Sequence, residues 1–177
     1  IGASGDTVNL ASGATAGFGK ILQVLSTTKT DTYSESISTR AVGNNVTGLA
    51  VTITPTSASS KLLVYSAINQ SRSGDSALGG FSFYRDGSPI LVGDSAGSRL
   101  SVSVGQHVVS GATLIGNSFQ FGQVDASSTN ATTFNIRLNN SSSGITRTYY
   151  INRTEDDTDA NNQNRAVSSI MVMEVSA

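Results

Sequence analysis

The stretch Phe81–Val92, FSFYRDGSPILV, carries the clearest local structural signal in the chain. Asp86 and Gly87 separate two strand-like runs of aromatic and aliphatic residues. Because an Asp-Gly pair accepts the positive φ angles of a type I′ turn, the dipeptide predicts a two-residue β-hairpin. Pro89 suits the start of the returning strand, where its missing N–H is tolerated. The stretch therefore predicts two antiparallel strands.

The same alternation with a period of two runs along most of the chain, and helical spacing is nearly absent. In Leu49–Thr54 large apolar residues alternate with small or polar ones until Pro55 ends the run. Strands are predicted at residues 20–26, 49–54, 61–68, 80–85, 89–93, 99–104, 107–115, 117–124, 133–138, 147–152 and 167–175. Many short strands separated by turn-rich segments indicate an all-β fold, an antiparallel, jelly-roll-like β-sandwich spanning residues 20–177.

Composition narrows the classes of partner. The chain has 177 residues, enough for one domain, and its charged fraction is 13%, compared with about 25% in typical soluble domains. A net charge of -1 with scattered Lys and Arg argues against nucleic-acid binding. No apolar run approaches the roughly 18 residues of a membrane span, so no membrane insertion is expected. Without cysteine, stability must come from core packing, from oligomerisation or from both.

Residues 1–19 differ from the rest of the sequence. Ala3–Thr7 is echoed by Ala11–Thr15, and the segment contains little apolar bulk. We interpret it as an extended N-terminal connector. It either continues an upstream shaft in which three chains share a core, or is a flexible tail. The absence of an initiator methionine suggests a processed product or a piece of a longer polypeptide.

Two of the predicted strands are apolar on both faces. They are Lys61–Ile68, KLLVYSAI, and Ser169–Val175, SIMVMEV. A strand in a two-sheet sandwich normally buries one face, so a second apolar face requires another cover. A neighbouring subunit and a long loop folded across the sheet are equally compatible with the pattern.

The segment Gly93–Gly97, GDSAG, matches the G-x-S-x-G spacing of a hydrolase nucleophile elbow. That elbow requires a helix after Ser95 and a later Asp or Glu followed by His. Here a strand-like segment follows Ser95, and the sole histidine, His107, comes twelve residues later with no helix between them. Gly, Asp and Ser are also common turn residues, so we interpret the segment as a turn with no catalytic residue. The glycine-rich Ala14–Ile21 lacks the first glycine and the Ser or Thr of a P-loop, so no cofactor is expected.

Acidic residues cluster in Thr154–Asn162, TEDDTDANN. Hard oxygen ligands at short spacing suit calcium, but the glycine and the final acidic residue of an EF-hand loop are missing. A solvated loop is the favoured interpretation, and no metal site is assigned. Polar loops supported by rigid sheets are typical places for surface recognition. The candidate surface-recognition residues are Asn139, Asn140, Arg153, Glu155, Asp156, Asp157 and Asp159.

Several segments at the two ends of the chain resemble a recurrent C-terminal domain of bacteriophage tail-fibre-like proteins, especially marine ones. The matching segments are Gly17–Thr32, Val46–Pro55, Ser59–Val64, Ser127–Phe134 and Ser168–Val175. The resemblance fades over residues 70–120. It implies a trimeric virion structural protein, exposed on the particle and assigned to host recognition, and it supplies no catalytic residues.

These observations converge on a non-enzymatic structural role. The expected function is a fibre or tip domain that forms a homotrimer, contacts other virion proteins and binds a glycan or protein on the host surface. The alternative is a capsid decoration or head-fibre protein with the same fold. A glycan-degrading enzyme is disfavoured, because such enzymes need paired carboxylates in a groove and most acids here lie in turns or in one cluster.

Overall fold

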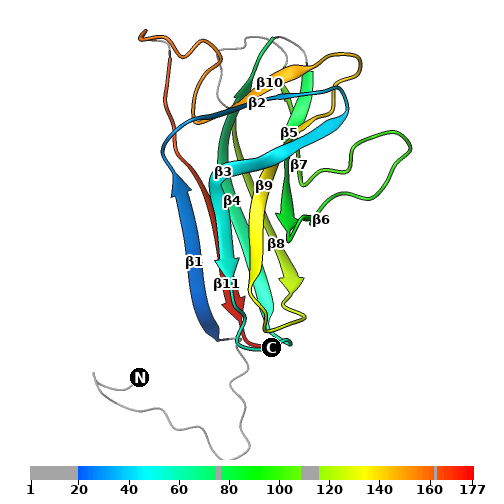
Figure 1. Cartoon of the computed structure of the whole chain (residues 1–177), viewed down its shortest axis with the longest axis vertical. Helices are drawn as coiled ribbons and strands as arrows, with labels where there is room; N and C mark the ends of the chain where they lie inside the picture. The colour runs from blue at the N-terminus through cyan, green and yellow to red at the C-terminus, as the bar shows by residue number, and fades with distance from the viewer. Residues whose placement is uncertain (1–19, 75–76, 109–115, 162) are drawn as a thin grey trace, which may run out of the picture.

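The computed structural model describes residues 20–74, 77–108, 116–161 and 163–177, which form β-strands and loops without a helix (Figure 1). The strands are β1 (Ile21–Lys29), β2 (Tyr33–Ile37), β3 (Ala41–Ile53), β4 (Lys61–Arg72), β5 (Ala77–Arg85), β6 (Ser88–Ile90), β7 (Val104–Val108), β8 (Gly116–Asp125), β9 (Thr132–Asn140), β10 (Arg147–Ile151) and β11 (Ser168–Val175). The predicted connector 1–19 and residues 109–115 of one predicted strand lie outside the described residues. Within those residues, no helix could span a membrane.

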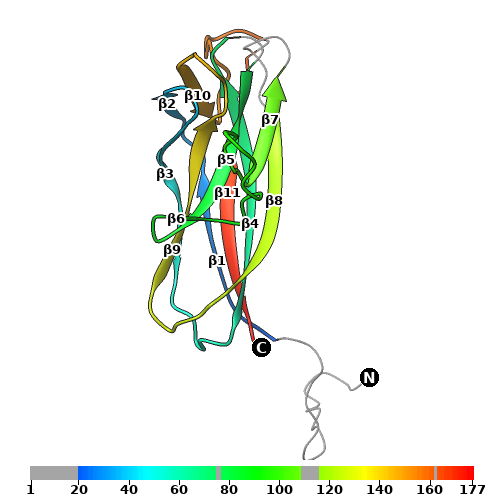
Figure 2. The same ribbon diagram turned by 90° about the vertical axis from the view of Figure 1, so that its right-hand side faces the viewer.

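The strands form two antiparallel sheets packed face to face (Figures 1 and 2). At three places in the sheets, two strands lie end to end and together occupy the position of one strand. These pairs are β1 with β2, β10 with β11 beside β4, and β6 with β7 beside β5. Sheet A thus runs β1/β2, β10/β11, β4, β8, and sheet B runs β3, β9, β5, β6/β7. Each sheet combines strands from both halves of the chain in the order of a jelly roll. The predicted sandwich is confirmed.

The predicted hairpin forms as a type I′ turn. Asp86 and Gly87 have φ values of 49° and 85°, and the register pairs Arg85 with Ser88. The Asp86 carboxylate accepts hydrogen bonds from Thr132 Oγ1 at 2.5 Å and from the Thr133 amide at 2.8 Å. These bonds lower the pKa of Asp86. The turn is therefore attached to β9 as well as closed within itself.

The core lies between the inward faces of the two sheets. Alternate residues of β5 and β9, such as Phe83 and Ile136, pack in one buried cluster with Val64 of β4 and Val172 of β11. The largest fully buried side chains are Tyr149, Phe81, Phe83, Phe134, Leu49, Ile53, Leu62, Ile68, Ile136, Leu138, Ile151 and Ile170. Burying a side chain of this size contributes about 1.5–3 kcal/mol, so these alternating positions hold the sandwich together.

Two regions differ from the strands expected from the sequence. Residues 99–103 do not form a strand, because the chain leaves the edge of β5 after Ile90 and returns only at Val104. The strand β2 and the first half of β3 were not predicted. Their sequences, YSESI and AVGNNVTG, are rich in Ser, Asn and Gly and have little intrinsic strand preference. Pairing with β10 and β9 holds them extended.

The two ends of the described chain meet at one end of the sandwich, which we call the base. The Ser176 amide donates to Lys20 O at 2.9 Å, beside the paired ends of β1 and β11. Residues 1–19 therefore join the domain at its base. The connection between β10 and β11 lies at the opposite end, which we call the tip (Figure 1).

A buried carboxylate ties three segments together near the base. Glu174 is fully buried and accepts hydrogen bonds from Gln23 Nε2 at 2.6 Å and from the Thr56 amide and Oγ1, both at 2.8 Å. Burial raises the pKa of this carboxyl, but the hydrogen bonds outweigh it and lower the pKa to about 2. Ionised Glu174 therefore joins β1, β11 and the segment after β3.

This arrangement predicts acid-sensitive stability. Because the pKa of Glu174 is depressed from 4.5 to about 2, its contribution is complete above about pH 4.5 and is lost as the pH falls through about 2. Glu174→Gln should lower the free energy of unfolding at neutral pH. The difference in this free energy between variant and wild type should shrink as the pH falls from about 4.5 to about 2. Urea unfolding at several pH values measures both effects. Asp94→Asn, which alters an exposed loop carboxylate, is the control, and a deficit independent of pH would contradict this role for Glu174.

Candidate functional site

Two of the interrupted strand positions carry long loops. The loop of residues 152–167 joins β10 to β11 at the tip, and the loop of residues 91–103 joins β6 to β7 at one side (Figure 1). Both leave a strand position and return to the same position, so the sheet continues past each loop. The candidate recognition residues and the GDSAG segment fall mainly on these two loops.

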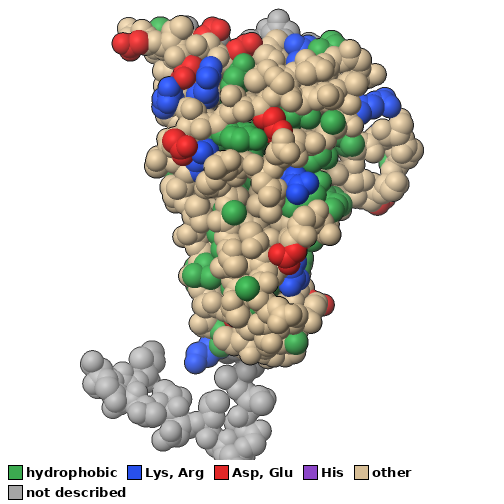
Figure 3. All heavy atoms as spheres, viewed as in Figure 1, with side chains coloured by type: hydrophobic (Ala, Val, Ile, Leu, Met, Phe, Trp, Pro, Cys, Tyr) green, Lys and Arg blue, Asp and Glu red, His purple; other side chains and the backbone are tan. Residues whose placement is uncertain are grey.

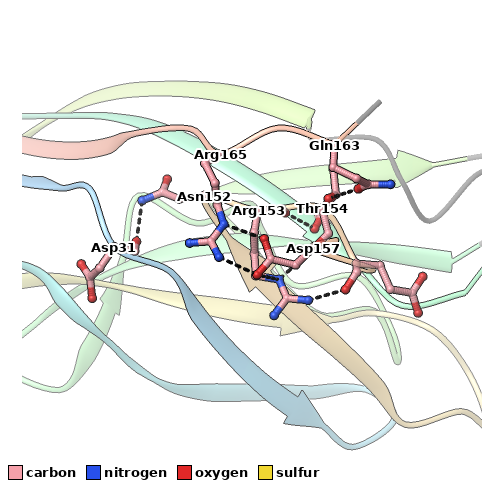
Figure 4. Close-up of polar contacts among 9 residues, drawn as sticks. Asp31, Asn152, Arg153, Thr154, Asp157, Gln163 and Arg165 are labelled. Carbon is pink, nitrogen blue, oxygen red and sulfur yellow. Dashed lines mark hydrogen bonds and ion pairs between the residues drawn. The ribbon is translucent and has the colours of Figure 1, made fainter. Parts of the chain in front are cut away.

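The neck of the 152–167 loop is closed by Asn152, which is fully buried and has a φ of 62°. Its Nδ2 donates to Lys29 O at 2.8 Å and to Asp31 O at 3.0 Å, and its Oδ1 accepts from Ser168 Oγ at 2.6 Å. Figure 4 shows this side chain reaching toward Asp31. One amide therefore bridges the break between β1 and β2 and the break between β10 and β11.

Charged side chains within the 152–167 loop pair with one another (Figure 4). Arg165 forms a bidentate pair with Asp157, with N–O distances of 2.6 and 2.7 Å. Arg153 Nε lies 3.7 Å from the same carboxylate, and its guanidinium lies 4.5 Å from the centre of the Tyr150 ring. Thr154 Oγ1 also donates to Gln163 Oε1. The loop is thus a folded unit with internal contacts.

The predicted recognition residues of the 152–167 loop differ in exposure. Asp156 and Asp159 are exposed, whereas Arg153, Glu155 and Asp157 are partly buried. Asp157 and Asp159 line a hollow of about 330 Å³ together with Thr158, Ala160, Gln163, Asn164 and Arg165. This part of the expected surface lies at the tip. The described residues contain no group of three or more Asp, Glu or His side chains placed to hold a metal ion.

The surface placement expected for Asn139 and Asn140 is wrong. Both lie at the end of β9 and are fully buried. Asn139 Nδ2 donates to Ser82 Oγ at 2.9 Å, and Asn140 Nδ2 donates to Ile37 O at 3.0 Å and Ile145 O at 2.9 Å. Their amides hold the strand ends and the following turn, so they present no surface to a ligand.

The GDSAG segment is a loop, as the turn interpretation predicted. Ser95 is exposed, and residues 94–103 are irregular where an elbow would continue as a helix. His107 lies in β7, paired with Leu78. At the neck, Ser103 Oγ accepts from the Phe83 amide at 3.0 Å and donates to Ile90 O at 3.2 Å. Ser103 closes this loop as Asn152 closes the other.

A groove of about 540 Å³ lies between the 91–103 loop and the outer side of sheet B, toward the tip. Its lining residues are Arg40, Leu78, Gly79, Ser98, Arg99, Leu100, Gly105, Gln106 and Ser141. In Figure 3 the loop stands away from the body of the molecule, with basic side chains above the gap. Sequence reasoning did not find this site, because its residues come from five separate segments and share no motif.

The outer face of sheet A carries a continuous apolar stripe. Phe119 and Phe121 of β8 are 60% and 56% exposed. In register, Phe121 lies beside Tyr65 of β4, and Tyr65 lies beside Met171 of β11. The next row of the same face, nearer the base, contains Leu63 of β4, Met173 of β11 and Val24 of β1, which are also paired across strands. Among the described residues, this stripe stays exposed to solvent, as the exposure of Phe119 and Phe121 shows.

Comparison with known proteins assigns the chain to no family. No protein-family model matches the chain, and no curated protein matches it. Among solved structures, a chain in "Structure of infectious bursal disease virus Gx strain" matches with a TM-score of 0.43 and 15% identity. The match covers 96% of this chain and 44% of the viral one, so this chain spans less than half of that chain's length. We draw no functional conclusion from so distant a similarity.

The 91–103 loop predicts different outcomes for its two glycines. Gly97 has a φ of 61°, whereas Gly93 lies outside the left-handed region, and a Cβ at either position would meet open space. Gly97→Val should therefore destabilise the loop by about 1–3 kcal/mol through backbone strain alone. Gly93→Val should not incur that strain, and Ser95→Ala should change stability by less than about 0.5 kcal/mol. Thermal unfolding measures all three, and equal losses at Gly93 and Gly97 would contradict the assignment.

Proposed function

We propose that this chain is a bacteriophage virion structural protein, the β-sandwich end of a fibre, which trimerises and binds the host cell surface. The role is non-catalytic. The observation that carries the proposal is the uncovered apolar stripe on sheet A, centred on Tyr65, Phe119 and Phe121. Exposed apolar surface of this kind marks a site of protein association.

Self-association is the favoured use of the stripe. The chain has no disulfide and has a long edge strand, β8, beside the exposed aromatic residues. Burying the stripe between identical subunits would protect that edge and add the apolar burial that a rigid projection needs. The trimeric number comes from the resemblance to tail-fibre-like C-terminal domains.

The arrangement of the ends supports a distal role in host binding. The described chain begins with Lys20 at the base, while the 152–167 loop and its exposed Asp156 and Asp159 lie at the opposite end. A domain attached through its base would present this loop away from the particle. Loops supported by rigid sheets are typical recognition surfaces.

The alternative is a capsid decoration or head-fibre protein. The jelly-roll connectivity favours keeping this alternative, because viral capsid domains commonly use it. Labelling the chain with antibodies on intact particles of the encoding virus distinguishes the two locations by electron microscopy. Label on the tail is expected, and label on the shell would overturn the fibre assignment.

The association proposal predicts a defined change in mass. Wild-type protein should sediment as three chains of 18.2 kDa each. Phe121→Asp should shift it toward a single chain, because a buried unpaired charge in the interface is strongly unfavourable. Ile145→Asp, at a residue that is 47% exposed outside the stripe, is the matched control and should remain trimeric. A monomeric wild type at micromolar concentration would contradict the proposal.

A further inference from the structure

We propose that the groove beside the 91–103 loop binds an anionic sugar, a saccharide unit that carries a carboxylate or phosphate group. The choice of a saccharide over other anions rests on the proposed host-surface function. The choice of an anion rests on the groove itself. Its volume of about 540 Å³ falls within the roughly 300–1,000 Å³ of small-molecule sites.

Charge distinguishes this groove from the hollow at the tip. Arg40 and Arg99 line it, and none of its described lining residues is acidic. In the part of the chain that the structure describes, neither guanidinium forms an ion pair or a hydrogen bond. By contrast, Arg165 at the tip is already bound to Asp157. Two unengaged guanidinium groups at one groove suit carboxylate or phosphate oxygens, which they bind in a bidentate manner.

The rest of the lining suits a sugar ring. Leu78 is 49% exposed and, with Leu100, supplies an apolar surface. Gly105, where an added Cβ would meet only Val102 Cγ2 at 4.0 Å, has no side chain to keep a ligand from the backbone. Ser98, Gln106 and Ser141 supply hydroxyl and amide groups around this surface. A pyranose ring has an apolar face and a rim of hydroxyls, so the mixture of groups matches it.

The two arginines lie on backbone that is held in place before any ligand binds. Arg40 has a φ of 48°, and its amide donates to Ser142 O at 3.3 Å. The segment that holds Arg40 is itself attached to β5, because the Ser141 amide donates to Leu78 O at 3.1 Å. Across the groove, the Arg99 amide donates to Ala96 O at 3.3 Å. Preorganised backbone of this kind reduces the entropy lost on binding.

The test uses the full chain on an array with three arms: uronic-acid oligosaccharides, phosphorylated saccharides and neutral oligosaccharides. Wild type should bind in at least one anionic arm and at least tenfold more weakly in the neutral arm. The responding arm identifies the anion. Arg40→Ala/Arg99→Ala should reduce that binding at least tenfold. Lys20→Ala/Lys61→Ala, which removes the same charge at the base, should not.

A steric variant tests the position of the site. A Cβ at Gly105 would meet only Val102 Cγ2, at 4.0 Å, so Gly105→Leu should fold and fill the groove. It should abolish binding while circular dichroism and sedimentation remain those of wild type. Binding that survives both Gly105→Leu and the double arginine variant, or a wild type that binds no anionic arm, would overturn the proposal.

Adsorption to cells that the encoding virus infects separates this proposal from the broader one. Wild-type chain that adsorbs to cells but binds no anionic saccharide would overturn the groove assignment and leave host binding intact. Wild-type chain that binds anionic saccharides in the groove but does not adsorb to those cells would leave the groove assignment standing and overturn host recognition.

Discussion

Burial of one face of every strand between two sheets is the constraint on which this molecule depends. Inward residues such as Phe83, Ile136 and Val172 form one buried cluster, and successive side chains on a strand point to opposite faces. The outward faces are therefore free to differ. On sheet A they are apolar across β8, β4 and β11, whereas the outer side of sheet B faces the groove. Different surface properties arise on one core because the period of two keeps the two faces independent.

The loops are accommodated without dividing the sheets. Interrupting a strand position removes ladder hydrogen bonds, and side-chain hydrogen bonds replace them at each neck. Asn152 does so where the β1/β2 and β10/β11 positions lie side by side, and Ser103 does so between β6 and β7. Because each neck is closed, long polar segments can extend from the sandwich while the strands on either side keep their register.

The resulting molecule has surfaces with distinct chemistry. The base carries both ends of the described chain, the tip carries an acidic loop with internal ion pairs, and the side carries a groove lined by Arg40 and Arg99. The apolar stripe on sheet A is separate from all three. Because the four surfaces lie apart, the self-association and ligand binding proposed above would use different residues.

The sequence by itself determined the all-β class, the hairpin at Asp86-Gly87 and the second apolar face of β4 and β11, because local φ preference and alternation depend only on neighbouring residues. Tertiary structure alone decided that β2 and the first half of β3 are strands, since pairing overrides their weak propensity. It also buried Asn139 and Asn140, which look like loop residues in sequence. Finally, it brought Arg40 and Arg99 to one groove, because only the folded sheets place residues from distant segments side by side.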